Sequence, residues 1–104
     1  MDEYKINISD SAKQDIRDTA AYISDELFES NFAENTTEAI LDAISSLNFM
    51  PARTPLVRDQ RLAKAGIRGK QVKNYTVFYR INETAKEVDI VRVFYSRRDW
   101  QAIL

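Results

Sequence analysis

Residues 75–95 read YTVFYRINETAKEVDIVRVFY, two largely apolar runs joined by a short polar stretch. Both runs are rich in aromatic and β-branched residues, which favour strands. They are apolar at almost every position, which indicates central strands of a sheet with both faces covered. The residues between them, 82–86, predict a hairpin turn. Residues 75–81 and 88–95 are therefore expected to pair as antiparallel strands.

Three further segments precede this hairpin. Residues 67–72 form another strand-like run, so the C-terminal half predicts a three-stranded antiparallel meander. Tyr4–Ile8 alternates apolar and polar residues, which is typical of a short strand. Pro51 and Pro55 bracket a loop that is expected to run from residue 50 to about residue 63.

Two amphipathic helices are expected between the first strand and this loop. Ser9 or Ser11 caps the first helix, with Ser11 and Gln14 at the spacing of a capping box, and Asn31 and Glu34 repeat that spacing at the start of the second. Their apolar stripes are Ala12, Ile16, Ala20, Ile23 and Leu27 in the first helix and Ala33, Ile40, Leu41, Ile44 and Leu47 in the second. So short a link between them predicts an antiparallel hairpin.

These elements together predict an α+β fold. Its order is an N-terminal strand, an antiparallel helix hairpin, a three-stranded antiparallel β-meander and a short C-terminal tail, with the helix pair covering one face of the sheet. A length of 104 residues suits a single domain spanning residues 1–104. No stretch resembles a signal peptide or a membrane span, so we expect a cytoplasmic protein without membrane contact.

The two halves of the chain carry opposite charge. Residues 1–50 hold three basic and eleven acidic residues, a net charge of −8, whereas residues 51–104 hold twelve basic and five acidic residues, a net charge of +7. The overall charge of −1 hides this asymmetry. A basic region on a small protein indicates a polyanion or an acidic protein as partner.

Several residue types are absent or scarce, and this excludes whole classes of site. The chain has no cysteine and no histidine, which excludes disulfides, a histidine-assisted nucleophile and a zinc site built from these residues. With two glycines it lacks a phosphate-binding glycine loop. Proton transfer would fall to Asp, Glu, Lys, Arg or Tyr. We therefore expect neither metal nor cofactor.

The first candidate site is a basic ladder formed by Lys64, Arg68, Lys70 and Lys73. On a strand, Arg68 and Lys70 would share a face about 7 Å apart, close to the spacing of successive phosphates in a nucleic acid. The alternative is a charged edge strand that resists aggregation.

Arg80 and Arg92 stand among apolar neighbours and are either ion-paired or functional. If the hairpin pairs residues 82 and 87, Arg80 faces Asp89 across the two strands, and a structural ion pair is favoured.

The C-terminal tail offers the last candidates. Arg97 and Arg98, flanked by Tyr95 and Trp100, could clamp a phosphate and stack a base. Trp100 is favoured as a core residue, whereas paired guanidinium groups favour function for Arg97 and Arg98. The acidic helices are favoured as an ordinary solvated face. Their charge could also exclude nucleic acid from that side, so the target is expected at the tail and at the sheet face opposite the helices.

The order of elements resembles the toxins of type II toxin–antitoxin systems in the RelE/ParE superfamily. The resemblance covers essentially the whole chain and is carried by IRGKQVKNYTVFYRI at residues 67–81 and VRVFYSRRDW at residues 91–100. It implies a growth-inhibiting toxin, of the kind associated with plasmid stabilisation.

The superfamily includes two activities. Members similar to RelE are ribosome-dependent mRNA endonucleases, whereas members similar to ParE poison DNA gyrase without a recognised catalytic centre. The nuclease members usually carry an arginine where this chain has Thr76, although many gyrase-type members do too. With Thr76 and no histidine, the chain resembles the ParE branch more closely.

The resemblance assigns residues to each activity. The target-binding residues would be Arg68, Lys70, Lys73, Arg97, Arg98 and Trp100. A nuclease would use Arg68, Lys70, Tyr95, Arg97 and Arg98 instead.

The resemblance also implies partners. A cognate antitoxin would hold the toxin inactive in a hetero-oligomer, with DNA gyrase, or alternatively the ribosome and mRNA, as the target. A third possibility is a non-toxic module that binds only its antitoxin.

Overall fold

The computed structural model describes residues 3–26, 30–96 and 104. Within these residues the strands are β1 (Lys5–Ile8), β2 (Arg68–Val72), β3 (Tyr75–Asn82) and β4 (Glu87–Tyr95). The α-helices of the same residues are α1 (Asp10–Ala21), α2 (Ser30–Ser46) and α3 (Gln60–Lys64). A π-helical turn, Tyr22–Glu26, follows α1, and a 3₁₀ turn, Pro51–Arg53, follows α2. The chain therefore has the predicted α+β order, with α3 as an addition inside the expected loop.

The four strands form one sheet in the order β1-β4-β3-β2. β1 lies parallel to β4, while β2, β3 and β4 form the predicted antiparallel meander. Asn82 pairs with Glu87 and Arg80 with Asp89, which is the predicted register. A shift between Phe78 and Tyr79 gives β4 one extra residue and bends its pairing with β3.

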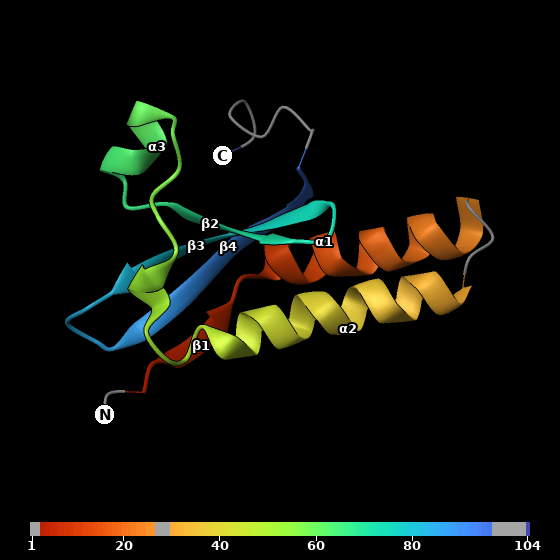
Figure 1. Cartoon of the computed structure of the whole chain (residues 1–104), viewed down its shortest axis with the longest axis horizontal. Coiled ribbons are helices and arrows are strands. Elements are labelled where there is room, and N and C mark those ends of the chain that lie inside the picture. Colours follow the sequence, from red (N-terminus) through yellow and green to blue (C-terminus); the bar gives the residue numbers. More distant parts are fainter. Residues whose placement is uncertain (1–2, 27–29, 97–103) are drawn as a thin grey trace.

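Each face of the sheet carries its own core. α1 and α2 run side by side along one face and project beyond the end of the sheet, whereas α3 lies on the other side (Figure 1). The larger core, between the helices and the sheet, includes Ile40, Val77 and Tyr79. The smaller core places Leu62 of α3 against Phe78 and Phe94. Residues 77–79 of β3 are at most 1% exposed, which confirms a central strand covered on both faces.

The helix starts differ in detail from the prediction. Ser9, not Ser11, caps α1, because its Oγ accepts a hydrogen bond of 3.0 Å from the N–H of Ala12. α2 begins at Ser30, so Asn31 lies inside the helix rather than at its cap. Leu41 was expected in the core but is 42% exposed, because it lies on the solvent side of α2. Leu27 and residues 97–103 lie outside the described residues.

Within the described part of the chain, the helices are too short or too polar to cross a membrane.

Candidate binding site

The basic residues of β2 lie on a different face of the sheet from the one expected. Arg68 pairs with Tyr79 and Lys70 with Val77, both of which belong to the core under the helices. A side chain at Gly69, by contrast, would point at Phe78 on the other face. Arg68 and Lys70 therefore share a face, as predicted. It is the helix-bearing face and not the opposite one, because the register of β2 places them beside residues that α1 and α2 cover.

The guanidinium group of Arg68 is engaged by the loop after α2. Its Nη1 donates to the carbonyl oxygen of Thr54 at 2.5 Å and to that of Ala52 at 3.3 Å. Nearby, Tyr79 donates its hydroxyl to the carbonyl of Pro51 at 2.6 Å. Burial raises the pKa of Tyr79, and the neighbouring cation of Arg68 offsets this only in part. Arg68 and Tyr79 thus fix the 3₁₀ turn onto the sheet.

Arg92 is an ion-paired residue. Its Nε and Nη2 donate to the carboxylate of Asp15 at 2.8 and 2.9 Å, and the backbone N–H of Val93 donates to the same carboxylate at 2.9 Å. These hydrogen bonds raise the pKa of Arg92. The structural interpretation of Arg92 is therefore confirmed.

Arg80 differs from Arg92. It faces Asp89 in the register, but Asp89 accepts a hydrogen bond of 3.0 Å from the side chain of Asn7. Arg80 is exposed, its stem passes close to Gly66, and within the described residues it forms no ion pair. The predicted register is correct and the predicted ion pair is wrong, because Asn7 on β1 takes the carboxylate.

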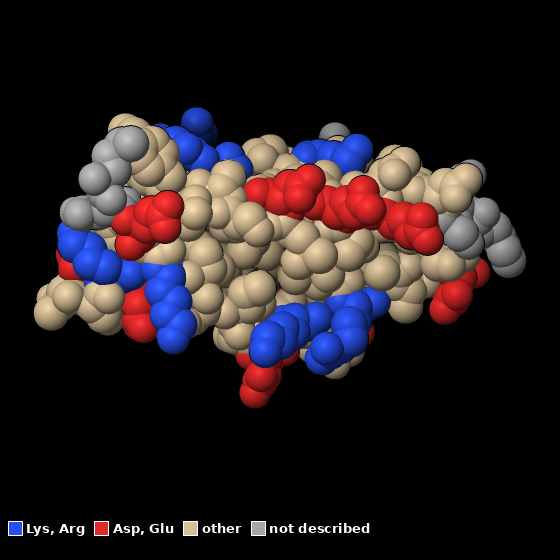
Figure 2. Space-filling view, turned by 90° about the horizontal axis from the view of Figure 1, so that it is seen from below, with Lys and Arg blue, Asp and Glu red and all other residues tan. Residues whose placement is uncertain are grey.

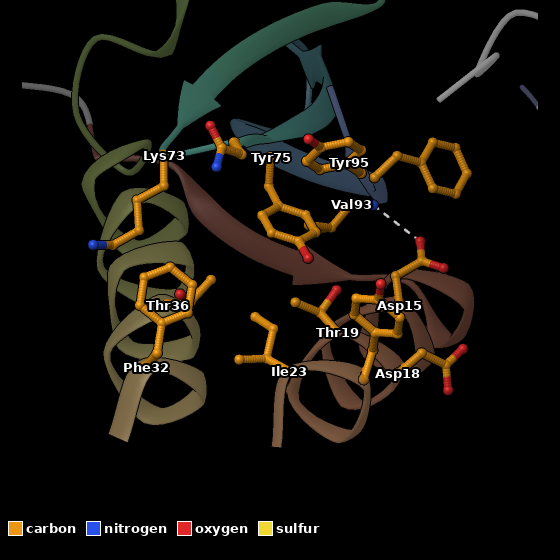
Figure 3. A pocket seen from close by; sticks show the side chains of 13 residues that line it. Asp15, Asp18, Thr19, Ile23, Phe32, Thr36, Lys73, Tyr75, Val93 and Tyr95 are labelled. Carbon is orange, nitrogen blue, oxygen red and sulfur yellow. Dashed lines mark hydrogen bonds between the residues drawn. The ribbon is translucent and has the colours of Figure 1, made fainter. Parts of the chain in front are cut away.

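A pocket of about 570 Å³ lies between the helix hairpin and the end of the sheet (Figure 3). Tyr22 and Phe32 approach it from the helices, and Tyr75 and Tyr95 from the sheet. The last two rings pack edge to face, with centroids 5.7 Å apart. Tyr75 is partly buried here, which raises its pKa, and a hydrogen bond with Thr19 partly offsets the rise. The pocket is therefore aromatic on both of its sides.

Polar groups complete the pocket. Lys73 takes a left-handed backbone conformation, with φ of 53°, in the turn between β2 and β3, and its Nζ lies 5.9 Å from the centroid of the Phe32 ring. Asp18 stands on the opposite side from Lys73 (Figure 3). Thr36 is 1% exposed, and its Oγ1 has no hydrogen-bond partner among the residues that the structure describes.

A small polar network fixes the chain where the tail begins. The hydroxyl groups of Thr76 and Ser96 lie 2.9 Å apart, and Gln71 donates to the Ser96 hydroxyl at 2.8 Å. The N–H of Ser96 also bonds to the carbonyl of Asn74 at 2.8 Å. The tail residues Arg97, Arg98 and Trp100, which the sequence proposed as target-binding, lie beyond this point and outside the described residues.

Two of the residues proposed for a nuclease, Arg68 and Tyr95, lie apart in the described part of the structure. Arg68 pairs with Tyr79 in the middle of β3, whereas Tyr95 pairs with Tyr75 at the start of that strand. Tyr75 and Tyr79 are four residues apart along β3, about 13 Å at the rise of a strand. The structure instead brings Lys73 and Tyr95 to one pocket.

Sequence reasoning missed Tyr22, Phe32 and Thr36. A signal for the first two was present, because both are large aromatic residues off the apolar stripes of their helices and next to the core positions Ile23 and Ala33. The sequence gave no signal for Thr36, because whether a buried hydroxyl finds a hydrogen-bond partner depends on how the side chains around it pack. In the described ranges no three carboxylates come close enough to suggest a metal site.

The sequence and the fold of this chain were compared with those of known proteins. The model of the family described as "ParE toxin of type II toxin-antitoxin system, parDE" matches residues 6–100. No curated protein matches the sequence. The chromosomal ParDE system from P. aeruginosa contains a chain of similar fold, with a TM-score of 0.73 and 14% identity, over 91% of this chain and 98% of that one. The RelBE2 toxin–antitoxin complex from Mycobacterium tuberculosis contains another, with a TM-score of 0.60 and 20% identity, over 89% and 98%.

Proposed function

The chain belongs to the ParE toxin family of type II toxin–antitoxin systems, and from this premise we propose that it arrests growth by poisoning DNA gyrase. On this proposal the toxin binds gyrase or its DNA complex and carries out no bond chemistry of its own. Its site of action would then be the cytoplasm.

One observation supports gyrase poisoning over mRNA cleavage, the other activity of the superfamily. A nuclease would need Arg68 and Tyr95 side by side, but Arg68 pairs with Tyr79 and Tyr95 pairs with Tyr75, four residues away along β3. Arg68 is also held by the carbonyls of Ala52 and Thr54, so it is poorly placed to stabilise a phosphate in a transition state. A toxin that acts by contact alone does not need these groups to converge.

The contact surface that we propose includes Lys73 and Tyr95, together with the tail residues Arg97, Arg98 and Trp100. Lys73 and Tyr95 are both exposed and both line the pocket, and the polar network of Ser96 fixes the point from which the tail departs. Lys70 is half-buried on the helix-bearing face and is a weaker candidate.

A supercoiling assay tests the proposal. Purified toxin, first shown to arrest growth when expressed alone, is titrated into DNA gyrase with relaxed plasmid. We expect loss of supercoiling. A higher concentration of the Lys73→Asn toxin should be needed to inhibit supercoiling, because the substitution removes the cation. Asparagine tolerates the left-handed backbone conformation of this position, so the turn should be kept. Lys13→Gln, on the exposed side of α1, is the matched control and should match the wild type.

Unchanged supercoiling at saturating amounts of a toxin that still arrests growth would refute gyrase as the target. Toeprinting on translating ribosomes is the companion measurement. Cleavage of mRNA in the A site would assign the toxin to the nuclease branch instead.

The proposal includes a cognate antitoxin that covers the toxin. The supporting features are the match to a family of toxin–antitoxin systems and the basic second half of the chain, which suits an acidic partner.

A further inference from the structure

Residues 43–82 form the most basic part of the chain. They contain eight arginine and lysine residues and a single carboxylate, that of Asp59. Asp59 is engaged at the start of α3, where its carboxylate accepts a hydrogen bond of 3.0 Å from the N–H of Leu62. This stretch therefore carries more positive charge than its own carboxylate can neutralise.

Three of these cations lie around the turn between α3 and β2. Lys64 ends α3, two residues before Gly66. Arg58 follows the residue whose N–H bonds to the carbonyl of Ile67 at 3.0 Å. The stem of Arg80 reaches the turn from β3, so closely that a Cβ at Gly66 would lie 3.6 Å from its Cγ. Arg58, Lys64 and Arg80 are all exposed, and together they form what we call the turn patch.

The turn patch is not neutralised by the fold. Its three cations form no ion pair with any residue that the structure describes. Arg80 has the best-placed candidate, because Asp89 faces it across β3 and β4. The carboxylate of Asp89 instead accepts a hydrogen bond of 3.0 Å from the side chain of Asn7. Positive charge is therefore left exposed at the turn.

The surface of α3 and its turn lacks the features of a protein interface or a single-strand site. Protein interfaces are centred on aromatic and apolar side chains, and sites for single-stranded nucleic acid stack bases on aromatic rings. Between residues 57 and 67, all of which the structure describes, no large apolar side chain is exposed. Leu56, just before this range, pairs with Arg68 at the edge of β2. The phosphates of a double helix need neither feature, only exposed cations.

The position of α3 also favours the turn patch as the side on which a polyanion approaches. α3 lies on the face of the sheet opposite to α1 and α2 (Figure 1). α2 carries exposed carboxylates, among them Glu34 and Glu38, which repel a polyanion from the helical side. The charge of the molecule therefore directs a nucleic acid to the α3 side.

We propose that the turn patch binds the phosphate backbone of duplex DNA, with Arg58, Lys64 and Arg80 each contacting a phosphate. The inference rests on the proposed function, in which the toxin acts on gyrase or its DNA complex, and it names the surface that holds the DNA. Guanidinium and ammonium groups bind phosphate oxygens through charge-assisted hydrogen bonds. Contacts to phosphates alone carry no sequence information, so binding is independent of base sequence.

Fluorescence anisotropy with a labelled duplex of about 20 base pairs, roughly two helical turns, tests the patch. The purified wild-type toxin should bind two duplexes of unrelated sequence equally. The logarithm of its affinity should fall with the logarithm of the salt concentration with a slope of about −2.7, because three phosphates are neutralised. Such a slope is about a 40-fold loss of affinity between about 50 and 200 mM sodium chloride.

Single substitutions assign the binding to the turn patch. Lys64→Gln and Arg80→Gln should each weaken binding of both duplexes and make the salt slope shallower by about 1. Lys13→Gln removes one exposed cation from α1, and as the matched control it should keep the wild-type slope. Lys64→Arg and Arg80→Lys keep the charge and should keep the slope too. Thermal melts should agree among all these exposed variants, which separates binding from folding.

Three results would overturn the proposal. The first is an equal salt slope for Lys64→Gln, Arg80→Gln and Lys13→Gln, because the DNA would then be bound elsewhere on the chain. The second is tighter binding of a single-stranded RNA of the same length. The third is a loss of antitoxin binding in Lys64→Gln and Arg80→Gln with DNA binding intact, which would assign the patch to an acidic protein.

The anisotropy assay contains no gyrase, so it is decided separately from the supercoiling assay. DNA binding by the turn patch with unchanged supercoiling would refute gyrase as the target and leave the patch standing. Inhibited supercoiling without any DNA binding would refute the patch and leave gyrase poisoning standing. If both proposals hold, a higher concentration of Lys64→Gln and of Arg80→Gln than of Lys13→Gln should be needed to inhibit supercoiling.

Discussion

At the scale of single residues, Asp15 joins the first helix to the last strand. Its carboxylate accepts two hydrogen bonds from Arg92 and one from the N–H of Val93. β1 pairs with β4 only up to Ile90, so Asp15 takes over the edge of β4 where β1 has ended. The carboxylate of Asp15 thus accepts the backbone hydrogen bond from Val93 at a position of β4 where β1 no longer pairs.

Asp15→Asn should destabilise the fold strongly. The amide cannot accept all three hydrogen bonds and leaves the guanidinium of Arg92, which is 26% exposed, without its counter-charge. We expect a loss of about 3 kcal/mol in the free energy of unfolding, measured by urea denaturation. Asp18→Asn, an exposed neighbour on α1, should change it by no more than about 0.5 kcal/mol. Equal urea midpoints for the two variants would contradict the role of Asp15.

Tyr79 should make the free energy of unfolding decrease with pH in the alkaline range. Its pKa is raised from the ordinary value of 10.0 by burial, so its folded-state pKa lies above its unfolded-state pKa. Its contribution is fully present below pH 10 and declines as the pH rises from 10 through the folded-state pKa. The free energy of unfolding should therefore fall less steeply above pH 10 in Tyr79→Phe than in the wild type. A Tyr79→Phe variant with the same slope as the wild type would refute the assignment.

At the scale of elements, the sequence predicted the sheet and the two long helices well. β3 and β4 are long and apolar, and α1 and α2 have clear stripes, so local pattern and tertiary packing agree for these four elements. α3 was missed because a helix of five residues, Gln60–Lys64, is too short to show a period. Its cap at Asp59, whose carboxylate accepts from the N–H of Leu62, was the available signal.

The candidate site was less predictable than the fold. The spacing of Arg68 and Lys70 correctly placed them on one face, but which face depends on pairing with Tyr79 and Val77, and that register is a property of the whole sheet. Likewise, Leu41 satisfied the helical spacing and yet faces solvent, because α2 already fills its core contacts with Ile40 and Ile44.

Left-handed backbone positions are the strained points of the connections. Met50 has φ of 49° between α2 and the 3₁₀ turn, and its side chain is 58% exposed. Met50→Gly should raise the free energy of unfolding by about 1 kcal/mol, because glycine adopts this conformation without a steric penalty. Met50→Ala keeps the penalty and should show no such gain. Chemical denaturation of both variants measures the difference, and an equal gain for the two would mean that loss of the exposed side chain is the cause.

At the scale of the whole molecule, charge is distributed by face. A row of acidic side chains runs along the helical side seen in Figure 2. α2 contributes Glu34, Glu38 and Asp42, which are exposed and four residues apart. An acidic partner is repelled from this side and favours the pocket end, where Lys73 is exposed.

Salt should therefore weaken binding of the proposed antitoxin. Exposed charges are screened beyond about 8 Å at physiological ionic strength and beyond about 3 Å at 1 M salt. We expect the dissociation constant to rise about tenfold between 0.1 and 1 M sodium chloride, mainly through slower association. The increase should be smaller for Lys73→Asn than for Lys13→Gln. A dissociation constant independent of salt would show that apolar contacts alone drive the complex.

The strand order has a consequence for how the toxin is made. β4, the last of the strands that the structure describes, lies between β1 and β3, so β1 has no neighbour in the sheet until residues 87–90 have been synthesised. Asp15 likewise cannot form its ion pair until Arg92 has been synthesised. An unfinished nascent chain therefore cannot complete the sheet or the pocket wall that β4 supplies. A cell that aborts translation before residue 87 therefore makes no folded toxin.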